Sequence, residues 1–181
     1  MRWTLLILLT LPSPLPPDDS LPFEAGRTVV VLQGYAGPWG HTGHAAFAYD
    51  FQAEIGTAVH AARAGVVVKP EARFADGNRT PGQENFVFMR HADGTFGRYY
   101  HLTRRGVLVT AGDRVRRGEL IARSGDTGAS AGPHLHFDVT RQCPEWGCQT
   151  IPIAFSDTNE NPLRAGSSYT TSPERNDHPK Q

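Results

Sequence analysis

The sequence carries no excess charge of either sign. Its 181 residues include 18 Lys and Arg and 18 Asp and Glu, so the formal net charge is zero. A chain with this balance has no bulk attraction for nucleic acid or for an anionic membrane. We therefore expect no nucleic-acid partner, and charge alone names no other partner.

The N-terminal apolar run is too short to cross a bilayer, which takes about 20 apolar residues. This run, Leu5 to Leu11, follows Arg2 and precedes a proline-rich, acidic stretch. The arrangement indicates a secretory signal peptide over residues 1–20, without a clear cleavage site. The alternative is a buried N-terminal strand or helix, but a packed element rarely ends in such a stretch. We expect a secreted or periplasmic protein with no membrane span in the mature chain.

Cysteine is scarce, with only Cys143 and Cys148 in the stretch CPEWGC. In an oxidising compartment, a disulfide closing this short loop would contribute about 2 kcal/mol by the chain-entropy estimate. A zinc knuckle is the alternative. It needs two further Cys or His nearby, and none follows closely downstream. The disulfide is the favoured interpretation.

Helical periodicity is also missing between residues 21 and 161. This segment instead contains short runs rich in Val, Phe and Tyr, separated by Gly, Pro and Asp: RTVVVLQG, GVVVKP, NFVFMRHADG, GRYYHL, GVLVTAGD, GELIARSGDTG and HLHFDV. Runs of this length and composition predict strands, so we expect an all-β domain of antiparallel strands over residues 21–161. Residues 162–181 are polar and are predicted to form a disordered tail.

Two histidines in GPHLHFDV, residues 132–139, stand one residue apart in a predicted strand. Residues i and i+2 of a strand lie on one face about 6.6 Å apart, so His134 and His136 share a face. Leu135 and Phe137 then point into the core. A lone histidine here would be read as a hydrogen-bonded structural residue, but two on one face favour a metal or catalytic site.

A catalytic zinc ion takes three protein ligands and leaves one position open for water. The stretch GHTGHAAFAYDF offers His41, His44 and Asp50 as further ligands. Asp50 stands in an apolar context, where a bare carboxylate is costly unless it is paired or bound to a cation. The alternative is an ordinary turn aspartate at the end of a strand.

The chain resembles the lysostaphin-type zinc metallopeptidases, a bacterial family that cleaves peptide bonds in peptidoglycan. The matching segments span about residues 32–155 in the family's order: QGYAGPWGHTGHAAFAYDF, GTAVHAARAGVVV, NFVFMRHADGTFGRYYHL, AGDRVRRGELIARSGDTGASAGPHLHFDV and TIPIAF. The resemblance implies antiparallel sheets with a duplicated hybrid motif that form an open groove. It also implies peptidoglycan peptides as the partner.

The resemblance assigns a Zn²⁺ ligand to Asp50 and another to His136, the second histidine of the HLH element. The stretch GHTGHAAFAYDF resembles the family's longer-spaced form, so we expect His41 to be the first ligand, with His44 as the alternative. His101 of YYHL and His134 match family residues that lie beside the zinc and are catalytic. An imidazole there can accept the proton of the attacking water, and another can orient that water or stabilise the oxyanion. We expect His134 to be the base.

Other classes of protein are excluded because the sequence lacks residues that they need. The DTG at 126–128 resembles an aspartic peptidase, which needs a second such loop or a dimer. Biotinyl and lipoyl carriers need a lysine at a hairpin tip, but the only lysines are Lys69, before a proline, and Lys180, in the tail. The HExxH string of helical zinc peptidases is absent.

A non-catalytic member of the same family, which activates a cell-wall amidase, is the remaining alternative. Such members have typically lost zinc ligands, whereas Asp50, His101, His134 and His136 are all present here. The sequence therefore predicts a zinc metalloendopeptidase that hydrolyses peptidoglycan stems or cross-bridges.

Overall fold

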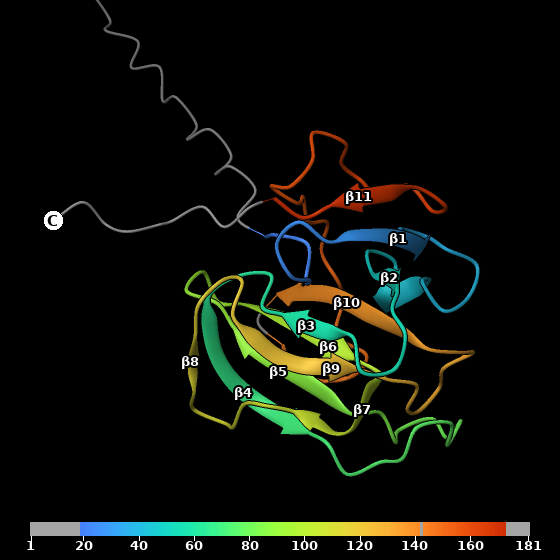
Figure 1. Ribbon diagram of the computed structural model, residues 1–181, viewed down its shortest axis with the longest axis vertical. Coiled ribbons are helices and arrows are strands. Elements are labelled where there is room, and N and C mark those ends of the chain that lie inside the picture. The colour runs from blue at the N-terminus through green and yellow to red at the C-terminus, as the bar shows by residue number, and fades with distance from the viewer. Residues whose placement is uncertain (1–18, 142, 173–181) are drawn as a thin grey trace, which may run out of the picture.

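The computed structural model describes residues 19–141 and 143–172, which fold into two antiparallel β-sheets (Figure 1). The predicted signal segment up to residue 18 and the chain after residue 172 lie outside the described residues. No helix among the described residues has the length and hydropathy of a membrane span. In chain order the elements are β1 (Thr28–Gln33), the 3-10 turn η1 (Gly43–Ala45), β2 (Tyr49–Gln52), β3 (Ala58–His60), β4 (Gly65–Glu71), β5 (Phe86–Arg90), β6 (Thr95–Tyr100), β7 (Leu102–Val107), β8 (Arg114–Val115), β9 (Leu120–Ser124), β10 (His134–Arg141) and β11 (Ser168–Thr170).

The larger sheet has eight strands in the order β11-β1-β2-β10-β6-β5-β4-β8, and the smaller sheet has three in the order β3-β9-β7. All the neighbouring strands pair antiparallel. The predicted all-β class is therefore confirmed.

The long strands coincide with the predicted apolar runs because β-branched and aromatic side chains suit a half-buried pleated surface. β1, β4, β5, β9 and β10 lie within or across these runs, and β6 begins slightly earlier than its run. β2, β3, β8 and β11 are only two to four residues long. A strand of that length shows too few alternations to be recognised from its sequence.

One apolar core draws side chains from both sheets, and Figure 1 shows the smaller sheet in front of the larger one. On β10 the side chains of Leu135, Phe137 and Val139 are fully buried in this core. Because successive side chains of a strand point to opposite faces, His134 and His136 lie on the other face of the large sheet. The predicted alternation along this strand thus places the two imidazoles together.

The prediction of a disordered tail from residue 162 onward is wrong for residues 162–172. β11 pairs with β1, with Tyr169 opposite Val29, and both Tyr169 and Leu163 are buried. The Leu163 amide also donates to the Tyr49 hydroxyl at 3.2 Å. Two buried apolar side chains and a backbone ladder hold this polar segment, and composition alone does not reveal a ladder.

Cys143 and Cys148 form a disulfide, as predicted. The bond closes the loop that follows β10. This loop is attached to the large sheet by Arg98 of β6, whose Nη1 donates to the Glu145 carbonyl at 2.6 Å. The loop therefore covers part of the sheet face that carries His134 and His136.

Candidate metal and catalytic site

Four neighbouring strands, β1, β2, β10 and β6, bring polar residues to one face of the large sheet. His136 on β10 lies directly opposite Asp50 on β2 and Tyr100 on β6. Gln33 on β1 lies opposite Asp50 from the other side. Residues directly opposite on antiparallel strands share a face and have neighbouring Cβ atoms, so strand register assembles this site from distant parts of the sequence.

Three of the predicted residues converge on one point. His41, Asp50 and His136 each offer a ligand atom, and these atoms lie within 4.8 Å of one another. Asp50 Oδ1 is 2.9 Å from His136 Nδ1 and 3.2 Å from His41 Nε2. The two imidazole nitrogens are 3.4 Å apart. The structure thus brings His41, and not His44, to the other two residues.

The outer nitrogens of both imidazoles are held by oxygen atoms. His41 Nδ1 lies 3.0 Å from the Gly34 carbonyl, and His136 Nε2 lies 3.1 Å from Asp138 Oδ2. Because these oxygens only accept, the outer nitrogens carry protons, and the inner nitrogens of neutral rings present lone pairs to the Asp50 carboxylate. Lone pairs and an anion that face one another repel unless a cation or a proton lies among them. The donor set therefore fits a divalent metal ion, and two imidazoles with one carboxylate are a ligand set of catalytic zinc.

The pKa values of Asp50 and His136 agree with a site built for a cation. Burial raises the pKa of Asp50, but the neighbouring imidazoles of His136 and His41 outweigh burial and hold that pKa well below its usual range. Burial lowers the pKa of His136, whereas hydrogen bonds to Asp138 and Asp50 raise it to about 9. The raised pKa of His136 thus reflects the demand of the two carboxylates for a positive charge at this position.

The other two predicted histidines lie beside this group. His134 Nε2 is 3.7 Å from Asp50 Oδ1, and its Nδ1 is held at 2.8 Å by the Gly132 carbonyl. His101 Nδ1 is held at 2.7 Å by the Thr127 carbonyl. The His101 and His134 rings are 4.5 Å apart between centroids. In their neutral forms both rings therefore carry the proton on Nδ1 and leave Nε2 as an acceptor.

His101 occupies an unusual backbone position. It lies between β6 and β7 with a φ of 60°, in the left-handed region that favours glycine. Burial lowers the pKa of His101 to about 3, assisted by positive charge on the nearby His134 and His136. Strained backbone positions of this kind concentrate at functional sites. The ring is thus held neutral and fixed next to His134.

A comparison with protein families matches residues 44–146, more than half of the chain, to the description "Peptidase family M23". The chain belongs to this family. The predicted resemblance to lysostaphin-type metallopeptidases is therefore confirmed. The match begins after His41, so the placement of His41 depends on the geometry alone.

Curated proteins that are similar in sequence are named as endopeptidases. The peptidoglycan DD-endopeptidase ShyC of Vibrio cholerae is 39% identical over 89 residues, which are 49% of this chain and 18% of ShyC. The glycyl-glycine endopeptidase ALE-1 of Staphylococcus capitis is 37% identical over 101 residues, 55% of this chain and 26% of ALE-1. The chain thus spans about a fifth to a quarter of the length of these curated relatives.

A solved structure shares the fold. A zinc-containing peptidase from Vibrio cholerae superposes with a TM-score of 0.53 and 26% identity, over 75% of this chain and 39% of that chain. The structural similarity extends over three quarters of the chain, in agreement with the family match in sequence.

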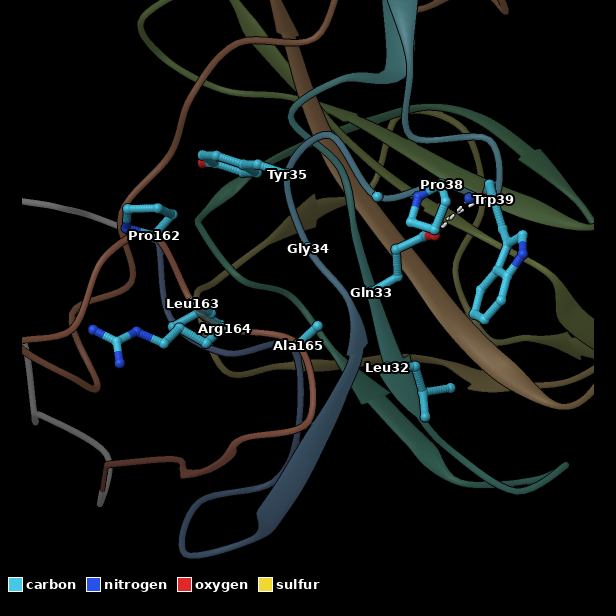
Figure 2. A pocket seen from close by; sticks show the side chains of 11 residues that line it. Leu32, Gln33, Gly34, Tyr35, Pro38, Trp39, Pro162, Leu163, Arg164 and Ala165 are labelled. Atoms are coloured by element: carbon cyan, nitrogen blue, oxygen red, sulfur yellow. Dashed lines mark hydrogen bonds between the residues drawn. The ribbon is translucent and has the colours of Figure 1, made fainter.

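One residue of this M23 site that the sequence did not reveal is Gln33, which is almost fully buried. Its Nε2 donates to Asp50 Oδ2 at 3.3 Å and to the Trp39 carbonyl at 2.8 Å, and its Oε1 accepts from the Trp39 amide at 2.8 Å. Figure 2 shows the hydrogen bond between Gln33 and Trp39 in a pocket that is also lined by Leu32 and Leu163. A Cβ at Gly37 would lie 2.1 Å from Gln33 Cγ, so only glycine lets the loop close on this side chain. Gln33 thus connects the loop to one oxygen of Asp50 and leaves the other facing the imidazoles.

An aromatic wall borders the site on the side of the disulfide loop. We use this term for His44, Tyr100 and Trp146. The Trp146 ring lies 5.9 Å from the His44 ring and 5.8 Å from the Tyr100 ring, and Tyr100 lies 5.5 Å from His136. Trp146 is 67% exposed although its ring is held on two sides. His44, the alternative ligand in the sequence, therefore belongs to this wall.

Proposed function

We propose that the protein is a zinc-dependent metalloendopeptidase that hydrolyses peptide bonds in the stems or cross-bridges of peptidoglycan. The observation that carries the proposal is the convergence of His41, Asp50 and His136 beside two imidazoles, those of His101 and His134, whose Nδ1 atoms are held by backbone carbonyls. Membership of the M23 family and the names of the relatives support the substrate class. We further propose that the protein acts outside the cytoplasm, because the Cys143–Cys148 disulfide requires an oxidising compartment.

The metal ligands in this proposal are His41 Nε2, the Asp50 carboxylate and His136 Nδ1. When bound there, zinc would act as a Lewis acid that polarises the scissile carbonyl and lowers the pKa of water. The protein has already desolvated these ligands, because the three side chains are 2–15% exposed. No rearrangement of β2 or β10 is needed to collect them.

His134 suits the role of general base. Its Nε2 accepts the proton of the attacking water, while its Nδ1 keeps its own proton and donates it in a hydrogen bond to the Gly132 carbonyl. His134 Nε2 lies 3.7 Å from Asp50 Oδ1, so the ring that takes up the proton stands directly beside the proposed metal ligands. The same proton is then available for the departing amine. His134 can thus act first as a base and then as an acid.

His101 suits a different role from the same side of the site. Burial holds its pKa near 3, so the ring resists protonation and is a poor base. Its Nδ1 proton is committed to the Thr127 carbonyl, so Nε2 can only accept a hydrogen bond. An acceptor fixed beside His134 orients the attacking water, whereas stabilisation of an oxyanion would require a donor.

The test combines metal analysis with digestion of intact peptidoglycan sacculi. Purified wild type is expected to hold one zinc ion per chain and to release soluble muropeptides. The His136→Ala variant should lose both zinc and activity, because a ligand is missing. The His134→Ala variant should keep zinc and lose turnover by about 10²–10⁴-fold, the usual contribution of a general base.

Two results would contradict the proposal. Muropeptide release at the wild-type rate by both variants would reject the assigned roles. A protein that releases no products from sacculi, but activates a cell-wall amidase when the two are mixed, would be the non-catalytic regulator instead. Mass analysis of the released muropeptides identifies the bond that is cleaved.

A further inference from the structure

The orientation of the His136 ring is fixed by a buried neighbour on the same strand, Asp138. Asp138 follows His136 by two residues on β10, so both side chains lie on one face of the sheet. Asp138 Oδ2 lies 3.1 Å from His136 Nε2, and Asp138 is only 1% exposed. The carboxylate is behind the imidazole, on the side away from Asp50.

A buried arginine compensates the charge of Asp138. Arg98 of β6 lies opposite Asp138 in the strand register and is 2% exposed. Arg98 Nε donates to Asp138 Oδ1 at 2.6 Å, and Arg98 Nη2 donates to Asp138 Oδ2 at 2.8 Å. A bidentate pair satisfies both oxygens. A buried ion pair is nevertheless weak evidence of a stabilising role, because well-packed apolar residues often replace one at no cost in stability. The pair therefore calls for another explanation.

We propose that the Asp138–Arg98 pair is a positioning device for the metal ligand His136. The inference rests on the proposed zinc site. Asp138 keeps a proton on His136 Nε2 and fixes the ring plane, so that Nδ1 points at Asp50 and His41. Arg98 fixes the position of Asp138 by donating to both of its oxygens. An oriented ring with its outer nitrogen protonated binds a metal ion more tightly than a free one.

Arg98 makes a third contact, and no other side chain could make all three. Its Nη1 donates to the Glu145 carbonyl in the disulfide loop at 2.6 Å. The planar guanidinium thus spans two strands and a loop, which a lysine ammonium cannot do. The same side chain that orients Asp138 also anchors the loop that carries Trp146.

The experiment removes the pair without leaving a buried charge. The double variant Arg98→Met/Asp138→Leu fills the space of the ion pair with apolar side chains and leaves the net charge of the protein unchanged. It is therefore designed to fold. The variant Arg98→Met/Asp138→Asn keeps an amide oxygen as an acceptor for His136 Nε2. Thr140→Val is the matched control, because Thr140 is buried on the same face of β10 and its hydroxyl donates to the Cys143 carbonyl.

Zinc affinity is measured by competition with a chromophoric chelator. We expect the Met/Leu variant to bind zinc about 10–100-fold more weakly than wild type, the usual effect of losing such an outer partner. The Met/Asn variant should recover part of this loss. Thr140→Val should melt at a lower temperature than wild type yet bind zinc within about twofold of it, since it leaves the hydrogen bond to His136 intact.

A second readout does not depend on zinc. In ¹⁵N-edited NMR of the metal-free protein, the Nε2 proton of His136 should be protected from exchange in wild type and unprotected in the Met/Leu variant. Equal zinc affinity of wild type and the Met/Leu variant, or equal protection of this proton, would overturn the inference. Failure of the proposed function is a separate result, in which wild type itself holds no zinc and releases no muropeptides.

Discussion

Removing the Cys143–Cys148 disulfide tests how the loop beside the site is held. The two cysteines are separated by 5 positions, so the closed loop is short. For a loop of this length the chain-entropy estimate gives about 2 kcal/mol of stabilisation. In a domain of this size, 1 kcal/mol shifts the melting temperature by about 2–4 °C, so we expect the Cys143→Ser/Cys148→Ser variant to melt roughly 4–8 °C lower.

The loss should be confined to the stability of the fold, because other contacts keep the loop in place. The Glu145 carbonyl still accepts from Arg98, and Trp146 still packs against Tyr100. The ion pair between Lys69 and Glu145 is about half exposed on both sides and adds little. None of these contacts uses the sulfur atoms, so zinc affinity should stay within about twofold of wild type, too small a change to reflect a lost outer partner.

The assay is thermal unfolding followed by circular dichroism in the presence of a chelator, since bound zinc would itself raise the melting temperature. Wild type, wild type with a thiol reductant, and the serine variant are compared. Reduced wild type should melt at the temperature of the serine variant. If the serine variant melts at the same temperature as oxidised wild type, the chain-entropy argument is refuted. If the serine variant loses zinc, the loop is part of the metal site.

Three further predictions concern the residues around the site. The folded pKa of His101, about 3, lies below its ordinary value of 6.5, so its contribution to stability is present above pH 6.5 and is lost as the pH falls toward 3; urea unfolding of metal-free protein between pH 7 and 4 should show wild type losing up to about 1.4 kcal/mol per pH unit more than His101→Asn, and parallel curves would contradict this. Gln33→Leu leaves the Trp39 amide and carbonyl without their partner, so we expect a loss of about 1–3 kcal/mol in urea unfolding together with weaker zinc binding by chelator competition; unchanged zinc affinity would mean that Gln33 supports only the loop. Trp146→Ala removes an exposed ring from the aromatic wall, so kcat/KM on sacculi should fall about tenfold, or ~1.4 kcal/mol, at unchanged zinc content, and an unchanged rate would place the substrate elsewhere.

Local pattern was sufficient to predict the strand that carries the site. In β10 the alternation of His134, Leu135, His136 and Phe137 is a period of two, and the structure buries the apolar pair and keeps the imidazoles on the opposite face. The same period reaches Asp138, which the sequence did not single out. A carboxylate two residues beyond a metal ligand is a signal that sequence reasoning could have used.

The other residues of the site depend on contacts that no local pattern contains. Gln33 and Arg98 reach the site only through strand register, with Asp50 and with Asp138. His41 and His44 stand in the same loop, and only the fold of that loop separates a histidine near Asp50 from one that stacks on Trp146. The folded segment after residue 162 also depends on a long-range contact, because β11 pairs with β1, which is far away in the sequence.

The loss of stability that comes from burying the polar groups of this site favours a catalytic role over that of a non-catalytic regulator. His41, His134 and His136 lie around the Asp50 carboxylate, and His101 packs beside His134. The outer nitrogens of these four rings are held by Gly34, Gly132, Asp138 and Thr127, respectively. Burying so many polar groups destabilises a fold unless each has a partner, and here every partner turns a second nitrogen inward. A protein that only presents its surface to an amidase could fill this space with apolar side chains at a gain in stability. Oriented lone pairs serve a metal ion and a proton transfer, and a regulator has no use for either.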